Sequence, residues 1–276
     1  MNRPCFQIKP HENGLFLLDA LASRLQCSKK KAKAMLDAKR VFVNDRRVWM
    51  AKHIVSHKDV VEIIPMETTA NKIEILKQFG DFIIVNKSAG LLTNGSSKSL
   101  EAILQRKLGN PTCCAVHRLD KETSGCVIFA NNDAAKEKLI PLFKEQAIVK
   151  IYRAIVGGRV SERLKTITRD IEGQSATTLV QVLCRGRDAS YLEMRIKTGR
   201  TRQIRKHLAA VRHPVLGDKG YAGSKGLAEI LRTLPRQMLH AHKLILSDPQ
   251  KKDELIRVAA PIPNDFKKTL NILKLK

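Results

Sequence analysis

The sequence has few acidic residues, no long apolar run and no paired cysteine motif. Its 26 Asp and Glu residues are outnumbered by 51 Lys and Arg residues, which leaves a formal net charge of +25. No stretch approaches the roughly 18 apolar residues of a membrane helix, and the first residues lack the apolar core of a secretion signal. We therefore expect a cytoplasmic protein that does not enter a membrane. The excess of positive charge indicates a polyanionic partner, and nucleic acid is the first candidate.

Residues that usually bind metals or nucleotides are scattered. The six cysteines include no Cys-x-x-Cys pair, and the eight histidines form no ligand motif, so we expect neither a metal site nor a disulfide framework. Lys87 and Gly90 do not stand in a phosphate-binding loop, which argues against a nucleotide cofactor. Without coiled-coil heptads, a monomer is the default expectation. The 43% of hydrophobic residues is enough for the cores of one large and one small domain.

The first part of the chain has the pattern of a small basic domain. Residues 1–13 show no period and are expected to form a short leader. Residues 14–64 carry 11 Lys and Arg against five Asp and Glu. Within them, leucines at helical spacing over 17–25 predict one helix, and Ser28 can cap a second helix that opens with lysines. Alternating valines from position 41 then predict a small sheet. Taken alone, the lysine run is more typical of a solvated helix face.

This order of elements, with Val-Phe-Val-Asn-Asp-Arg-Arg-Val at 41–48, resembles the S-four RNA-binding domain, a module named after a small-subunit ribosomal protein. In that family the basic second helix and the following turn contact the RNA backbone. The resemblance implies an S-four-like domain at 14–66. The RNA-binding residues that it implies in this chain are Lys29, Lys30, Lys33, Arg40, Arg46 and Arg47.

After a linker at 65–74, residues 75–276 are expected to form a second and larger domain. Period-two patterns predict strands at 82–85, 150–156, 177–183, 191–197 and 239–246. Helical patterns are found at 100–108, 131–146 and 199–212. Pro141 is expected to kink or end the middle helix, and the chain after the last strand is expected to be a tail through Pro261 and Pro263.

The loop 117–125, His-Arg-Leu-Asp-Lys-Glu-Thr-Ser-Gly, lies between two apolar runs and is the main candidate for a site. Cationic neighbours keep the Asp120 carboxylate ionised, and the flanking strands fix its position. A carboxylate held at an RNA surface by cations can act as a nucleophile or general base at a sugar. The ordinary alternative for a single aspartate is an ion pair with Arg118 or a loop cap.

This loop resembles the signature of the RluA-type pseudouridine synthases, which isomerise uridine in RNA without a cofactor. The other motifs of that family occur in the same order, and the match covers roughly residues 75–266. They are Asn-Lys-Ser-Ala-Gly at 86–90, Lys-Ile-Tyr-Arg-Ala at 150–154, Gly-Arg-Thr-Arg-Gln-Ile-Arg-Lys-His-Leu at 199–208, His-Pro-Val-Leu-Gly-Asp at 213–218, Leu-His-Ala at 239–241 and Ala-Pro-Ile-Pro at 260–263. The resemblance implies an α+β protein whose catalytic domain has a mixed, mostly antiparallel sheet.

The same resemblance implies roles for individual residues. Asp120 would be the catalytic acid, either attacking C1′ or removing a ribose proton so that the uracil detaches, turns and rejoins through C5. Tyr152 would lie against the uracil, although a packed strand aromatic is the ordinary alternative. Arg205 would pair with Asp120 rather than remain solvated. Arg118 would fill the space left by the flipped uridine or clamp a phosphate, and Arg202 would contact RNA.

Two positions depart from the family pattern. Ser88 stands where the family usually has proline, and Arg202 stands where many members have histidine. Both departures concern the subfamily and its target rather than the type of reaction, because neither replaces the acid, the tyrosine or the pairing arginine.

We therefore expect an enzyme that isomerises uridine to pseudouridine in structured RNA, with large-subunit ribosomal RNA as its target. The main rival is a catalytically silent RNA-binding or ribosome-assembly factor on the same fold, because both need phosphate contacts. A third alternative, hydrolysis of a glycosidic bond, usually needs two carboxylates. Glu122 is the only second acid close to Asp120 in the sequence, and it lies on the same loop.

Overall fold

The computed structural model describes residues 5–38, 40–63, 73–145, 147–221, 234–248 and 254–275. The chain forms two compact units, Met1–Thr68 and Thr69–Lys276, which we describe separately. Most of the linker expected at 65–74 lies outside the described residues. In the described ranges, no helix is both long enough and apolar enough to cross a membrane.

The first unit combines two helices with a four-stranded sheet. Its elements are α1 (Leu17–Arg24), α2 (Lys29–Asp37), β1 (Cys5–Gln7), β2 (Val41–Val43), β3 (Arg46–Val48) and β4 (Val60–Ile63), and the strand order is β1-β4-β2-β3. Ser28 caps α2, because its Oγ accepts a hydrogen bond of 3.3 Å from the backbone N–H of Lys31. Ala32 and Leu36 bury the apolar side of α2 in the core of this unit. The predicted capped, basic helix is confirmed.

The expectation of a leader over residues 1–13 is wrong for its described part. The short strand β1 pairs antiparallel with β4, with Phe6 opposite Val61. Ile8, which directly follows β1, is only 1% exposed and packs in the core of the first unit. Three residues of strand are too few to show a period, so burial here depends on a partner more than fifty residues away.

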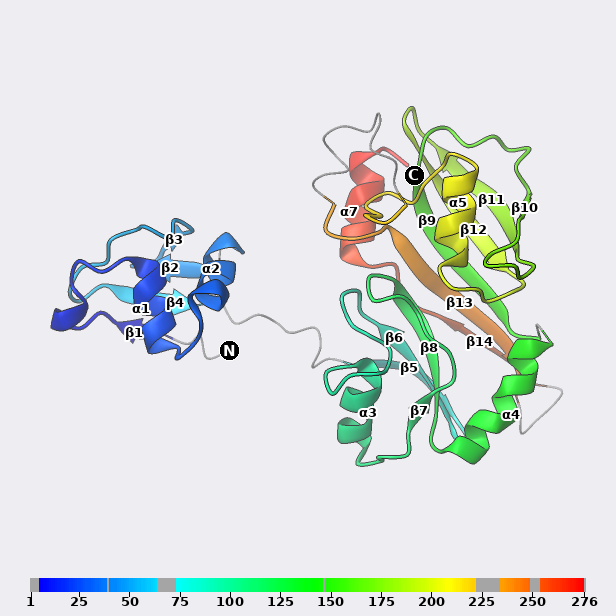
Figure 1. The fold of residues 1–276 in the computed structure, drawn as a ribbon, viewed down its shortest axis with the longest axis horizontal. Coiled ribbons are helices and arrows are strands. Elements are labelled where there is room, and N and C mark those ends of the chain that lie inside the picture. The colour runs from blue at the N-terminus through cyan, green and yellow to red at the C-terminus, as the bar shows by residue number, and fades with distance from the viewer. Residues whose placement is uncertain are drawn as a thin grey trace. The chain divides into compact units, whose positions relative to one another are not determined.

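The second unit is built on one large mixed sheet (Figure 1). Its strands are β5 (Glu74–Phe79), β6 (Phe82–Lys87), β7 (Cys114–Ala115), β8 (Ser124–Ala130), β9 (Val149–Gly157), β10 (Thr166–Thr168), β11 (Thr177–Arg185), β12 (Ala189–Ile196), β13 (Leu239–Ser247) and β14 (Leu255–Ala259). The main order is β10-β11-β12-β9-β13-β8-β6-β5, with β14 beside β13 and β7 beside β8. Among the described strand pairs of this sheet, only β13 with β8 is parallel. The mixed, mostly antiparallel sheet is therefore confirmed.

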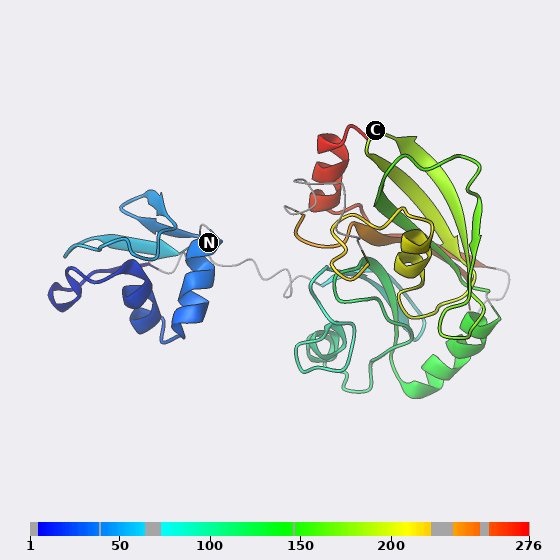
Figure 2. The same ribbon diagram turned by 45° about the horizontal axis from the view of Figure 1, so that its top comes forward.

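Helices cover both faces of this sheet (Figure 2). They are α3 (Leu100–Leu108), α4 (Asp133–Lys144), α5 (Gln203–Ala210) and α7 (Asn264–Ile272). Successive side chains of a strand point to opposite faces. On β6, Ile83 therefore packs in the core that includes α3 and α5, whereas Ile84 packs in the core that includes α4 and β14.

Two features of this unit differ from the predictions. Of the two effects expected of Pro141, a kink or an end of the helix, the end does not occur, because α4 continues through Pro141 to Lys144. Apolar side chains on both sides of the proline anchor it, since Leu139 is fully buried and Phe143 is partly buried in the same core. The expected tail instead forms β14 and α7, where Phe266 is fully buried.

Candidate active site

The Asp120 loop joins β7 to β8, and the buried side chain of Lys87 holds its backbone in place. Lys87 is 0% exposed, and its ammonium donates hydrogen bonds to three backbone carbonyls: Ser88 O at 3.0 Å, Leu91 O at 2.6 Å and Lys121 O at 3.0 Å. Burial lowers the pKa of Lys87 to about 7, although the negative charge of Glu122 acts to raise it. This lysine thus fastens the turn after β6 to the residue that follows Asp120.

Two further side chains fix the backbone on either side of Asp120. The hydroxyl of Thr93 donates to Leu119 O and accepts from Leu119 N–H, each at 3.1 Å. Arg236 is 5% exposed and donates to the carbonyl of Glu122 at 3.3 Å. The same guanidinium forms a bidentate ion pair with Asp265 of α7, in which Nε donates to Oδ2 at 2.6 Å and Nη2 donates to Oδ1 at 3.0 Å. The loop is therefore tied to the C-terminal helix through one arginine.

The end of the loop requires a glycine. Gly125 has a φ of +117°, and a Cβ at this position would lie 2.1 Å from Ala241 O on the parallel neighbour β13. Backbones can approach this closely only where no side chain intervenes. Beside it, Ser124 Oγ lies 2.9 Å from His240 Nδ1. The Ser-Gly of the loop and the Leu-His-Ala of β13 thus form one packed junction.

We expect the second unit to lose stability in mild acid because of its buried histidines. Burial lowers the pKa of His240 to about 4, and the nearby charges of His242 and Arg236 act in the same direction. Burial also lowers the pKa of His117 to about 3. A histidine kept neutral in the folded state contributes stability that is complete above its unfolded pKa of about 6.5 and is lost as the pH falls towards the folded value. For His240 alone the loss reaches about 3 kcal/mol by pH 4.

Denaturant unfolding followed by circular dichroism between pH 7 and pH 4.5 checks this expectation. His240→Gln should unfold at lower denaturant at pH 7 but show a flatter pH dependence, while the exposed His11→Gln should follow the wild type. Equal slopes for His240→Gln and the wild type would show that His240 is not responsible.

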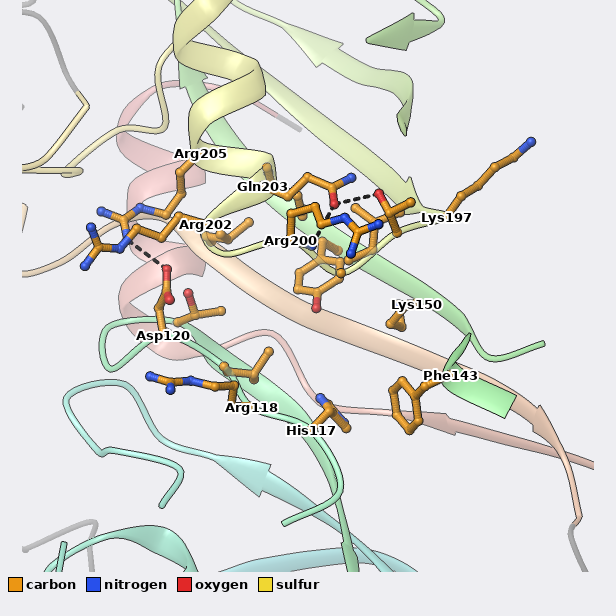
Figure 3. Close-up of a pocket in the computed structure, with 18 of the residues that line it drawn as sticks. His117, Arg118, Asp120, Phe143, Lys150, Lys197, Arg200, Arg202, Gln203 and Arg205 are labelled. Atoms are coloured by element: carbon orange, nitrogen blue, oxygen red, sulfur yellow. Dashed lines mark hydrogen bonds and ion pairs between the residues drawn. The ribbon is translucent and has the colours of Figure 1, made fainter. Parts of the chain in front are cut away.

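Arg205 of α5 links the Asp120 carboxylate to a second, buried carboxylate. Its Nη1 donates to Asp120 Oδ2 at 2.7 Å, and its Nε and Nη2 donate to Asp218 at 2.6 and 2.8 Å (Figure 3). The side chain of Asp218 is only 1% exposed, that of Asp120 28%. Burial alone would lower the pKa of Arg205, but the hydrogen bonds that it donates to Asp218 and Asp120 raise it above its ordinary value. The expected pairing of Arg205 with Asp120 is therefore present, and Asp218 orients the arginine.

A cavity of about 620 Å³ opens beside Asp120. Among the described residues that line it, Asp120 is the only carboxylate, and the basic ones are His117, Arg118, Lys150, Lys197, Arg200, Arg202 and Arg205. The second oxygen of Asp120, Oδ1, accepts no hydrogen bond from any residue that the structure describes. One carboxylate oxygen is thus fixed by an arginine, and the other is free to react.

Tyr152 of β9 also lines the cavity and is 9% exposed. Burial raises the pKa of its hydroxyl, and the charge of Asp120 raises it further, so the phenol stays neutral. A neutral aromatic wall beside a carboxylate suits a flat, uncharged base. Geometry therefore brings Asp120, Tyr152 and Arg205 together at one cavity.

The residues expected to bind RNA fall into two groups. Arg118 and Arg202 are exposed and line the cavity, and Arg202 precedes α5 with a φ of +55°. The six others lie in the first unit, where Lys30, Lys33, Arg46 and Arg47 are exposed, Lys29 pairs with Asp19 at 2.7 Å, and Arg40 is half-buried. Arg47 also stacks on Phe42, 5.1 Å from the ring centroid.

Sequence reasoning missed Asp218 and Arg236 as site residues. Asp218 ended a motif that resembled the family, but nothing local showed that it would contact Arg205. Arg236 had no pattern at all, because its partners Glu122 and Asp265 lie far away in the chain. In the described part of the chain, no three His, Cys, Asp or Glu side chains gather into a group that could hold a metal ion.

Comparison with known proteins agrees with this geometry. The profile of the RNA pseudouridylate synthase family matches residues 81–210. Ribosomal large subunit pseudouridine synthase D of Haemophilus influenzae is 29% identical, over 97% of this chain and 94% of its own length. A Bacillus subtilis protein named as an uncharacterized RNA pseudouridine synthase is 31% identical, over 94% of both chains.

A solved structure shares the fold over about three quarters of the chain. Human RNA pseudouridylate synthase domain containing 4 aligns with a TM-score of 0.61 at 24% identity, over 74% of this chain and 94% of its own. With the sequence relatives, this likeness leads to one conclusion: the chain belongs to the RluA-type RNA pseudouridylate synthase family and is an isomerase that forms pseudouridine in RNA.

Proposed function

We propose that this enzyme converts uridine to pseudouridine in large-subunit ribosomal RNA, with Asp120 as its catalytic acid. The observation that carries the proposal is the asymmetry of the Asp120 carboxylate, in which Oδ2 is bound by Arg205 while Oδ1 lies without a described partner at a cationic cavity. The ribosomal target is supported by the name of the Haemophilus influenzae relative and by the net charge of +25.

The isomerisation breaks the bond between C1′ and N1 and forms a bond between C1′ and C5, while the C5 proton leaves to solvent and N1 gains a proton. Asp120 Oδ1 either attacks C1′ and is later displaced by C5, or removes a ribose proton and returns it. In both routes the hydrogen bond from Arg205 holds the carboxylate in position, and Tyr152 holds the detached uracil against the sugar. Neither route needs a nucleotide cofactor.

The cationic lining offsets the repulsion between Asp120 and the RNA. In this proposal Arg118 enters the space that the flipped uridine leaves, and Arg202 binds the backbone nearby. Their exposure at the cavity supports both roles.

The first unit acts as an S-four-like RNA-binding domain in this proposal. The cap at Ser28, the exposed lysines of α2 and the arginines of β3 support it. Lys30, Lys33, Arg46 and Arg47 contact the RNA backbone, whereas Lys29 first has to leave Asp19 and Arg40 is half-buried. The protein acts as a monomer.

The rival function of glycoside hydrolysis finds little support. Inverting or retaining hydrolysis uses a second carboxylate that faces the same substrate. Glu122 does not line the cavity, and Asp218 is buried behind Arg205, so neither acid can serve. The other rival, a catalytically silent RNA-binding factor on the same fold, is disfavoured by the relatives, which are named as pseudouridine synthases.

Mapping of pseudouridine in cellular ribosomal RNA tests the proposed target. We expect carbodiimide and primer extension to show that one or a few large-subunit sites disappear when the gene is deleted and return with the wild-type gene. An unchanged large-subunit map, with sites lost from another RNA instead, would move the target elsewhere.

A further inference from the structure

The end of the cavity away from Asp120 contains a buried lysine whose ammonium has no hydrogen-bond or ion-pair partner among the described residues. Lys150 lies with Phe143 and His117 at this end, while Arg205 and Asp120 lie at the other (Figure 3). Lys150 is 6% exposed, and its Nζ lies 5.6 Å from the centroid of the Phe143 ring. Among the residues that the structure describes, this ammonium makes no hydrogen bond and no ion pair.

Such a group is costly for the fold. A buried charge without a counterion destabilises the folded state, and desolvation accordingly lowers the pKa of Lys150. Lys87 shows the contrast, because it is also buried but donates to three carbonyls. Apart from its cation–π contact with Phe143, the Lys150 ammonium has no described protein partner and lines the cavity, so its three N–H donors are available to a ligand there.

The charges of the residues around Lys150 indicate which charge a ligand at this end would carry. Asp120, the only acid among the described lining residues, is paired with Arg205. His117 adds no charge, because its Nε2 accepts a hydrogen bond of 3.1 Å from Ile128 N–H. Lys197 and Arg200 line the same cavity. The ligand at this end is therefore an anion.

The backbone beside the ammonium leaves room for it. A Cβ on Gly199 would lie 3.7 Å from Lys150 Nζ, so any larger side chain there would cover the charged group. Lys150 and Tyr152 are two residues apart on β9, which places both on one face of the strand about 7 Å apart. A phosphate held at Lys150 would therefore lie within about one nucleotide of a base held at Tyr152.

We propose that Lys150 forms a phosphate subsite, which binds the backbone phosphate of the nucleotide next to the target uridine. Lys150 is then a positioning residue: it holds the RNA strand so that the target ribose lies against Asp120 Oδ1. The inference rests on the proposed function, because it takes the target uridine to lie between Asp120 and Tyr152.

The test compares Lys150→Met with Lys77→Met, which removes an exposed lysine outside the cavity. The probe is a fluorescent oligouridylate, titrated at several salt concentrations. For Lys150→Met we expect the dissociation constant to rise about tenfold, as for a lost charged hydrogen bond, and the slope of log K against log salt to fall by about 0.7. Its melting temperature should rise, because the unpaired charge is gone. Lys77→Met should change neither binding nor melting appreciably.

A second set of probes locates the phosphate. In RNA fragments that carry the mapped uridine, a neutral methylphosphonate at one neighbouring linkage should weaken wild-type binding about as much as Lys150→Met does, and should have no further effect on that variant. The subsite is overturned if Lys150→Met lowers the melting temperature and leaves affinity and salt slope unchanged, or if every methylphosphonate affects both proteins equally. Failure of the proposed function looks different, because the wild type would then convert no uridine.

Discussion

Replacement of Asp120 by asparagine should reduce pseudouridine formation by about three orders of magnitude or more, the scale of losing a nucleophile or general base. In the wild type, Arg205 binds Oδ2 and leaves Oδ1 facing the cavity. An asparagine in the same place has to give its single carbonyl oxygen to Arg205. Its NH₂ group, a donor without a reactive lone pair, then takes the place of the reacting oxygen.

This loss should occur without unfolding. Asp120 is partly exposed, and Arg205 keeps both hydrogen bonds to Asp218, so we expect a change in stability of no more than about 1 kcal/mol. The measurement is release of tritium from RNA labelled at uridine C5, together with the melting temperature. Glu122→Gln is the matched control, because it neutralises the other acid of the loop and should keep most of the activity. Equal loss in both variants would contradict a special role for Asp120.

Replacement of Arg205 by methionine should remove both activity and stability. The substitution removes the hydrogen bond that orients the Asp120 carboxylate. It also leaves the buried carboxylate of Asp218 without its two charged hydrogen bonds. Breaking a buried pair by removing one partner costs about 3–5 kcal/mol. Arg205 also stacks on Tyr221, 5.0 Å from the ring centroid, and that contact is lost as well.

A double variant separates the two effects. Arg205→Met combined with Asp218→Asn removes the stranded charge, so it should regain part of the stability measured by denaturant unfolding while staying inactive in tritium release. Recovery of activity in the double variant would show that Arg205 serves only to neutralise Asp218.

Local patterns predicted the elements whose signals are local. Ser28 lies three residues from the N–H that it caps, and the leucines of α3 lie within two turns of one another. The pairing of Asp120 with Arg205 spans 85 residues. Only the family resemblance could predict it, because no periodicity connects such distant positions.

The features that were missed depend on distant partners. The role of Arg236 depends on its hydrogen bonds to Glu122 and to Asp265 of α7. The prolines at 261 and 263 led to the prediction of a tail in this region, but Pro263 is the N-cap of α7. The isolation of Lys150 could not be predicted either. A lysine on a strand normally extends to solvent, and only the assembled cavity shows that this one does not.

The most direct test of the central claim is a pseudouridine map of total ribosomal RNA from deletion cells that carry either the wild-type gene or Asp120→Asn. The account predicts that the wild type restores every site that deletion removes and that Asp120→Asn, expressed at the same level, restores none. If Asp120→Asn restores those sites, Asp120 is not the catalytic acid, and if deletion removes no site, the chain acts by binding RNA rather than by modifying it.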